Sequence, residues 1–378
     1  MGGLQGSLSA VTAVELGAAA IRAAVERAGV DASRIDEAFI GNVLSAGLRQ
    51  GPARQAALQA GLSPATGCVT LNKLCGSGMQ AAMYAYDSII AGTNHCVVAG
   101  GMESMSNAPH LVMGARGGVR TGHSQFLDHM FFDGLEDAST SRMMGSFAQE
   151  TANANGLTRE AMDAFAIESL TRAQNAIRNG DLADEIVPVT VKGRKGDTVV
   201  SDDEQPLTAN IDKIPGLRPA FAKDGTITAA NSSSISDGAS ALVIMSESAA
   251  REQGLAPLAR IVGHARHSQA PGEFTLAPIG AMQKLLAKTG WSKDEVDLFE
   301  INEAFAMVTM LAMRDLALDH NKVNIYGGAC AQGHPIGSTG ARIVVTLMHA
   351  LRRNGLKKGV ASLCIGGGEA TAMAIELL

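Results

Sequence analysis

The chain has 378 residues, is 46% hydrophobic and carries a formal net charge of −6. This length predicts two or three domain-sized units with large buried cores. The negative charge and an aromatic content of only 4% argue against nucleic-acid binding, which relies on basic surfaces and on aromatic rings that stack with bases. We therefore expect no nucleic acid among the partners.

The cysteines and the N-terminal residues indicate the cellular compartment in which the protein is expected. The five cysteines are an odd number with no spacing typical of a disulfide framework, which favours a reducing compartment. The stretch from Met1 to Gln5 has neither the basic nor the apolar region of a secretory signal peptide. No apolar run reaches the roughly 18 residues that span a membrane. We therefore expect a cytoplasmic protein that does not bind membranes.

Helices and strands are predicted to alternate over the first hundred residues. Periodic apolar positions and terminal glycines favour helices over 14–28 and 52–61, and a buried helix over 79–91. Short β-rich runs favour strands within 35–44, at 68–71 and at 96–99. This alternation is typical of an α/β fold.

A different composition begins at about residue 106 and continues to 235. This stretch is rich in charge and in Gly and Pro breaks, with a helix predicted over 159–179. The βα alternation then resumes, with strands predicted at 241–245, 258–265, 296–301 and 359–364 and helices at 278–289, 304–316 and 340–353. Segments 98–103 and 364–369 resemble each other, a weak sign of two similar halves. We expect one half formed by 1–105 and 236–257, an inserted subdomain over 106–235, and a second half over 258–378.

Four side chains that can carry chemistry lie in short, mostly glycine-rich motifs. Cys75 is followed by Gly-Ser-Gly, His334 lies in Gly-His-Pro-Ile-Gly, Cys364 precedes three glycines, and Asn302 opens Asn-Glu-Ala-Phe. A thiol, a histidine and a second thiol are the parts of an acyl-transfer site, because one cysteine can hold an acyl group while the other moves a proton.

Each of these residues also has a structural alternative. Cys75 lies just before a predicted helix whose N-terminal amides would lower the pKa of its thiol, but it could be a buried structural cysteine. His334 could activate a thiol or lie at a surface turn. The glycines after Cys364 could present backbone N–H groups to an oxyanion, or Cys364 could be an ordinary strand residue. Asn302 on its own is more typical of a helix cap. No spacing such as Cys-x-x-Cys occurs among them, so we expect no metal site.

In this order and spacing the motifs resemble the thiolase family, especially its acetoacetyl-CoA type. The resemblance extends from about Leu4 to the C-terminus and includes Gly-Gly-Met-Glu-Ser-Met-Ser at 100–106, Asp-Gly-Leu at 133–135 and Leu-Arg-Pro-Ala-Phe at 217–221. It implies an acyltransferase that reversibly joins two acetyl-CoA into acetoacetyl-CoA and CoA. Coenzyme A and acetyl-CoA are then substrates, and no cofactor is expected.

The resemblance also implies a role for each site residue. Cys75 would be the acylated nucleophile, His334 its activator and a member of one oxyanion hole, and Asn302 the holder of a water in that hole. Cys364 would be the acid and base, and the backbone N–H groups of Cys75 and Gly366 the second oxyanion hole. The residues implied to bind CoA and substrate are Ser233, Phe221, Met144, Ala304 and Phe305.

The implied fold has two similar halves, each βαβαβαββ, packed as α-β-α-β-α layers, with the inserted subdomain binding CoA. A homo-oligomer, dimer or tetramer, is implied as well. The family begins with a strand that carries an Ala-x-Arg-Thr-Pro-like segment, whereas this sequence starts near the loop after it. We therefore expect a central strand of the first sheet to be missing. Met143 stands where acetoacetyl-specific members often have histidine.

Other functions are weighed against this one. A degradative 3-ketoacyl-CoA thiolase of broader chain length would share the mechanism and differ in its pocket; stretch 116–135 looks closer to the short-chain enzymes. A ketoacyl synthase lacks a second catalytic cysteine, so Cys364 argues against it. A non-catalytic acyl-CoA or lipid-binding protein on this scaffold is disfavoured because all four catalytic positions are present.

Overall fold

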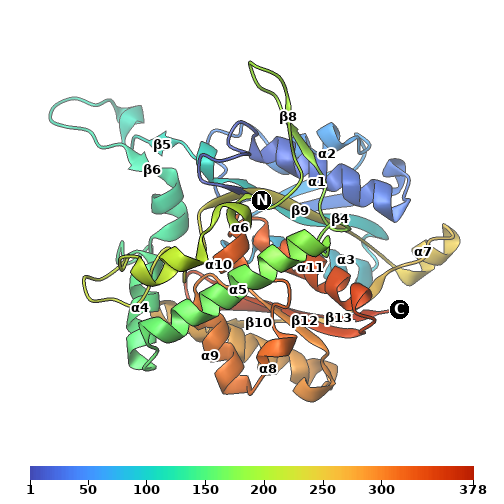
Figure 1. Cartoon of the computed structure of the whole chain (residues 1–378). Helices are drawn as coiled ribbons and strands as arrows, with labels where there is room; N and C mark the ends of the chain where they lie inside the picture. The colour runs from blue at the N-terminus through green and yellow to red at the C-terminus, as the bar shows by residue number, and fades with distance from the viewer.

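Two mixed β-sheets form the centre of the protein, whose computed structural model describes residues 1–378 (Figure 1). The strands of the first sheet are β1 (Gly2–Gly3), β2 (Glu37–Gly41), β3 (Gly67–Leu71), β4 (Cys96–Ser104) and β9 (Ser236–Met245). Those of the second are β10 (Ala259–Ser268), β11 (Leu298–Ile301), β12 (Lys358–Ile365) and β13 (Glu369–Leu377). Their orders are β1-β9-β4-β2-β3 and β10-β13-β12-β11.

The two sheets repeat one pattern of strand pairing. β4 lies parallel to β2 and antiparallel to β9, and β12 lies parallel to β11 and antiparallel to β13. β4 and β12 therefore occupy equivalent places in the two sheets. β4 contains segment 98–103, and β12 ends within segment 364–369, the two segments that resemble each other in sequence. The predicted pair of similar α/β halves is confirmed.

Alternating side chains of the strands separate the molecule into layers. Val97 and Ala99 of β4 share a core cluster with α3 (Ser77–Ile90), α11 (Thr339–Arg353) and residues of β12 and β13, so these two helices lie between the sheets. Val98 and Met102 point the other way, towards α1 (Ala13–Ala28) and α2 (Pro52–Ala60). On the far face of the second sheet, Val360 packs in a cluster with α8 (Ala277–Thr289) and α9 (Ala306–Leu316). The layers are α-β-α-β-α, as predicted.

The segment between β4 and β9 is mostly helical and loop structure. Its elements are β5 (His110–Leu111), β6 (Leu127–Asp128), α4 (Met144–Ala154), α5 (Arg159–Asn179), β7 (Val189–Val191), β8 (Thr198–Val200) and α6 (Glu204–Thr208). The long α5 runs across the molecule in Figure 1 and contacts α9, α6 and α10 (Ala329–Gln332). α7 (Glu247–Glu252) connects β9 to β10. None of the helices combines the length and the apolar character that a membrane span requires.

Several strands differ from the sequence-based expectation, among them β9, which begins at Ser236 instead of the predicted 241, and the two described next. β4 continues past the predicted end at Ala99 because glycine permits close packing there: a Cβ on Gly100 would lie 2.1 Å from the Ser240 oxygen, and one on Gly101 1.9 Å from the Gly337 oxygen. β13 was not predicted. Half of its buried run is alanine, a residue of low β propensity, and it is held as a strand by pairing on both sides.

β1 lies at the edge of the first sheet and pairs with only Ser236 and Asp237 of β9. Its counterpart β10 pairs with β13 from end to end. The expectation that a central strand would be missing was therefore wrong, because β4 pairs directly with both β2 and β9. Beside the rest of β9 lies a mainly apolar groove of about 1480 Å³, which α1 and α11 also line, and none of the predicted catalytic residues borders it.

Candidate active site

Cys75 lies in the tight turn between β3 and α3. The preceding residue, Leu74, adopts a left-handed φ of 47°, which is strained for a residue with a branched side chain. Its N–H donates to Asn72 Oδ1 at 2.9 Å, which supports the turn. After the cysteine, a Cβ on Gly76 would lie 2.3 Å from Ile365 Cδ1. The turn is therefore pressed against the end of β12, which brings the N-terminal nucleophile candidate to the C-terminal half.

The environment of the Cys75 sulfur differs from the sequence-based expectation. Burial raises the pKa of this thiol to about 11, and Glu103 adds to the rise, although the backbone N–H groups of Gly366 and of Cys75 itself act in the opposite direction by donating hydrogen bonds to the sulfur. The predicted lowering of the pKa by the helix N-terminus was wrong because loss of solvent outweighs it. Cys75 is thus a neutral thiol at rest that needs a base, and two amides already converge on its sulfur.

His334 is a buried histidine whose hydrogen bonds define its tautomer. Its Nδ1 lies 2.6 Å from Thr339 Oγ1, and that hydroxyl donates to the Pro335 oxygen at 3.0 Å. Since the hydroxyl proton is used there, Thr339 accepts a hydrogen bond from Nδ1–H, and Nε2 carries the lone pair. Nε2 has no partner within the protein. Burial and the charge of Arg342 lower the pKa of His334 to about 3, so a neutral base is present at physiological pH.

Thr339 was missed by the sequence analysis. Its position five residues after His334, at the first turn of α11, was the available signal, but a threonine at a helix start has many structural explanations. The contact with Nδ1 depends on how the loop folds back, which the sequence does not display.

Cys364 lies near the end of β12 and is completely buried. Burial raises the pKa of its thiol well above the usual value, and a negative charge on Cys75, when that thiol is ionised, raises it further. Such a contribution requires the two sulfurs to lie near each other. Cys75 and Cys364, 289 positions apart in the chain, therefore form a pair of desolvated thiols where the two halves meet.

Asn302 follows β11 and does not cap a helix. The next helix, α9, begins at Ala306 with Phe305 in the capping position and without a side-chain cap. The amide nitrogen and oxygen of Asn302 are buried and have no partner within the protein. Its neighbour Glu303 is held by Ser169 Oγ and by an amide of Asn324. The capping alternative is excluded, and a fixed, unpaired amide is left to bind a polar ligand or water.

The residues predicted to bind substrate gather beside Cys364. Ala304, Phe305 and Cys364 belong to one buried apolar cluster, against which Met144 and Phe221 pack. The Phe221 and Phe305 rings meet edge to face, with centroids 6.2 Å apart. Met144 also lies close to Gly366, since a Cβ on this glycine would be 3.3 Å from the Met144 sulfur. Ser233 joins this wall through its backbone, because its N–H donates to the Ala304 oxygen at 2.9 Å.

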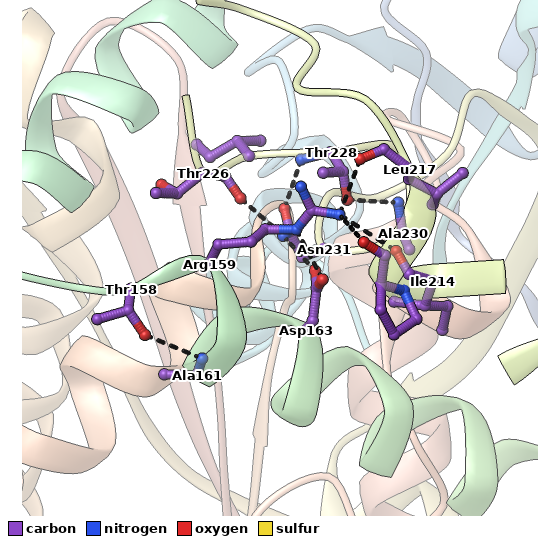
Figure 2. A network of polar contacts seen from close by, with 12 residues as sticks. Thr158, Arg159, Ala161, Asp163, Ile214, Leu217, Thr226, Thr228, Ala230 and Asn231 are labelled. Carbon is purple, nitrogen blue, oxygen red and sulfur yellow. Dashed lines mark hydrogen bonds and ion pairs between the residues drawn. The ribbon is translucent and has the colours of Figure 1, made fainter. Parts of the chain in front are cut away.

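A polar network fixes the segment that leads to Ser233 (Figure 2). At the start of α5, Arg159 donates to Asp163 at 2.6 Å and to the Leu217 oxygen at 2.9 Å. Asp163 in turn accepts from the Asn231 amide, whose oxygen accepts from the Thr228 N–H. This network ties segment 214–231 to a long helix, so the segment that leads to Ser233 rests on rigid structure. No group of three His, Cys, Asp or Glu side chains is arranged to hold a metal ion.

Comparison with known protein families identifies the family to which this chain belongs. The model of the thiolase N-terminal domain matches residues 1–248, and the model of the thiolase C-terminal domain matches residues 255–377. The chain belongs to the thiolase family. The resemblance inferred from the motifs and the predicted thiolase-like fold are thereby confirmed.

Several thiolase relatives match the whole chain. A probable acetyl-CoA acetyltransferase of Dictyostelium discoideum is 49% identical over all of this chain and 92% of its own. The acetyl-CoA acetyltransferase of Cupriavidus necator is 46% identical, with 100% and 96% covered. Among solved structures, the Bacillus anthracis acetyl-CoA acetyltransferase superimposes with a TM-score of 0.97 at 43% identity, covering 100% and 96%. Acat5 thiolase from Ascaris suum in complex with coenzyme A gives 0.94 at 41%, covering 100% and 97%.

Proposed function

We propose that this thiolase is an acetyl-CoA C-acetyltransferase that reversibly converts two acetyl-CoA into acetoacetyl-CoA and CoA. The observation that carries the proposal is the pair of neighbouring, desolvated thiols, Cys75 and Cys364, together with a neutral histidine whose Nε2 is free. Full-length relatives named acetyl-CoA acetyltransferase support it. The non-catalytic alternative is disfavoured because a binding protein does not need two neighbouring thiols, one of them completely buried, and a buried, unpaired base.

In the first half-reaction, His334 Nε2 takes the proton of Cys75, and the thiolate attacks the thioester carbonyl of acetyl-CoA. The N–H groups of Cys75 and Gly366, which already converge on this sulfur, stabilise the negative oxygen of the tetrahedral intermediate. The carbon–sulfur bond to CoA then breaks. The departing CoA sulfur takes the proton of Cys364, which leaves an acetyl-Cys75, a Cys364 thiolate and a protonated His334.

In the second half-reaction, the Cys364 thiolate takes a proton from the methyl group of a second acetyl-CoA. The resulting enolate oxygen is stabilised by the Nε2–H of protonated His334 and by a water held by the Asn302 amide. The enolate carbon attacks the acetyl carbonyl on Cys75, and acetoacetyl-CoA leaves. The Cys75 thiolate recovers its proton from His334, so every group returns to its starting state.

The inserted segment supplies the proposed CoA site, with Ser233 and Phe221 near the pantetheine arm and Met144, Ala304 and Phe305 lining the acyl pocket. We also propose that the protein forms a dimer or tetramer. We place it in the cytoplasm, because both catalytic thiols must stay reduced. Coenzyme A enters as substrate in this chemistry, and no cofactor takes part in the proposed steps.

A second candidate is a thiolase of broader chain length in fatty acid degradation. Relatives in Staphylococcus aureus that are named probable acetyl-CoA acyltransferase are 43% identical over 98% of this chain. Met143, where acetoacetyl-specific members often have histidine, also favours a less strict pocket. Both candidates share one mechanism and differ only in the acyl chains they accept.

The test is CoA-dependent cleavage of acetoacetyl-CoA beside longer 3-ketoacyl-CoAs, with Cys75→Ser as the control. Activity confined to acetoacetyl-CoA supports the acetyltransferase, whereas comparable activity across chain lengths supports the broader enzyme. Cys75→Ser should lose acetyl transfer and incorporation of label from acetyl-CoA. A folded protein with no thiolytic activity, or a Cys75→Ser variant that still becomes labelled, would contradict the proposal.

A further inference from the structure

Glu103 is a completely buried carboxylate near the end of β4, and none of the proposed catalytic steps uses it. It accepts four hydrogen bonds, all from neutral amides. Oε1 accepts from Asn42 Nδ2 at 2.9 Å and from the Leu44 N–H at 3.1 Å. Oε2 accepts from the Val43 N–H at 3.0 Å and from the Gly337 N–H at 2.9 Å. An ionised carboxylate is an acceptor only, which suits a site with four donors.

These donors belong to two different halves of the protein. Asn42, Val43 and Leu44 directly follow β2, which pairs with the strand that leads to Cys75. Gly337 belongs to the Gly-His-Pro-Ile-Gly loop of the C-terminal half, three residues after His334. Glu103 therefore connects the sheet that places the nucleophile to the loop that places the base.

The loop at Gly337 is seated closely on the first sheet. A Cβ on Gly337 would lie 2.7 Å from Glu103 Oε2, and a Cβ on Gly41 would lie 2.7 Å from the Gly337 oxygen. Two serines of β9 hold the loop as well, since Ser236 accepts from the His334 N–H at 3.2 Å and Ser240 donates to the Ser338 oxygen at 2.9 Å. Burial raises the pKa of Glu103 to about 7. Above that pH it is the only one of these anchors with a formal charge, and hydrogen bonds to a charged acceptor are the stronger ones.

We infer that Glu103 is a positioning residue for catalysis, which holds the His334 loop against the first sheet so that Nε2 faces the Cys75 thiol. The inference rests on the proposed function, in which His334 takes the proton of Cys75. Glu103 touches neither the substrate nor the reacting atoms. Its charge also raises the pKa of the Cys75 thiol directly, but its positioning effect passes through His334, so removing it weakens the base rather than the binding of CoA.

The direct test measures alkylation of Cys75 by iodoacetamide, which needs the same proton transfer but no CoA chemistry. In Glu103→Gln, the new amide group faces N–H donors, so one side of the anchor is lost. We expect alkylation of Cys75, followed by mass spectrometry at pH 8, to slow about 10- to 100-fold. The KM for acetoacetyl-CoA should stay within about twofold while kcat falls with the alkylation rate.

The decisive comparison is a double-mutant cycle with His334→Asn. If Glu103 acts through His334, then Glu103→Gln slows alkylation in the wild-type background but not in the His334→Asn background. Equal slowing in both backgrounds would overturn the inference, as would an unchanged rate in Glu103→Gln alone. An enzyme without thiolase activity that still shows this coupling would refute the proposed function and leave the positioning role standing.

Two further variants guard against a general loss of structure. Asp237→Asn is a matched control, because Asp237 is also a buried carboxylate that accepts a backbone N–H, from Ser106 at 2.9 Å, and it holds no part of the His334 loop. It should alkylate within about twofold of the wild-type rate. If Glu103→Gln does not fold, Glu103→Asp keeps the charge on a shorter side chain that no longer reaches all four donors. If Glu103→Asp slows alkylation in the wild-type background but not in the His334→Asn background, the inference is supported. If it slows alkylation in both backgrounds, the inference is overturned.

Discussion

The hydrogen bond between Thr339 and His334 gives the sharpest prediction about the catalytic base. Replacing Thr339 with the isosteric valine removes the acceptor for Nδ1–H, 2.6 Å away in a buried site. An unsatisfied buried donor costs about 1–3 kcal/mol, so the Nδ1–H tautomer loses that much of its advantage over the tautomer with the proton on Nε2. A protonated Nε2 cannot take the proton of Cys75. We therefore expect kcat for acetoacetyl-CoA cleavage to fall about 5- to 150-fold, since each 1.36 kcal/mol is a factor of ten.

Steady-state kinetics of three variants test this reasoning. Thr339→Val should lower kcat and leave KM within about twofold, because the CoA-binding wall is untouched. Thr339→Ser keeps the hydroxyl and should retain most of the activity. Thr371→Val makes the same isosteric change at a completely buried threonine whose hydroxyl has no partner, so it should not reproduce the loss. If Thr339→Val kept its kcat within twofold of wild type, the tautomer argument would be wrong.

Two further predictions concern Cys364 and Glu300. Cys364→Ala should still be acetylated at Cys75 by acetyl-CoA, detected as a mass increase on the intact protein, but should not form acetoacetyl-CoA; normal condensation would refute its role as acid and base. Burial raises the pKa of Glu300 from 4.5 to about 8, opposed by Arg342. Because the folded pKa is the higher one, its contribution favours folding below pH 4.5 and is lost as the pH rises towards 8. Glu300→Gln should therefore lose less stability than wild type between pH 5 and pH 9 in urea unfolding, and an identical loss in both proteins would count against the burial argument.

Local patterns were sufficient to predict the alternation of helices and strands and the four chemical motifs, whereas the α-β-α-β-α layers were implied by the resemblance to the thiolase family. Cys75, Asn302, His334 and Cys364 each stand at the end of a strand or in a glycine-rich turn, and such turns present side chains at sheet edges. Helix α5 was predicted over its full observed range, 159–179, since it has a clear threonine cap and a terminal glycine.

The electrostatics of the site could not be predicted in the same way. The helix that follows Cys75 is visible in the sequence and suggests a lowered pKa. The burial that raises the pKa depends on the folded chain, in which distant residues such as Ile365 press against the turn at Gly76. In the sequence, Glu103 likewise has the pattern of an ordinary polar residue in a loop that follows two glycines. Its four donors lie in two loops that only the folded chain brings together.

Leu74 connects catalysis to stability in this protein. A left-handed backbone at a leucine costs about 1–2 kcal/mol, and the rest of the fold must offset that cost to keep the Cys75 turn tight. Glycine at this position would relieve the strain, but it would remove the side chain that lies beside the Gly366 loop. Selection for heat resistance and selection for turnover are therefore expected to favour different residues at position 74. Heat resistance favours glycine, and turnover favours leucine.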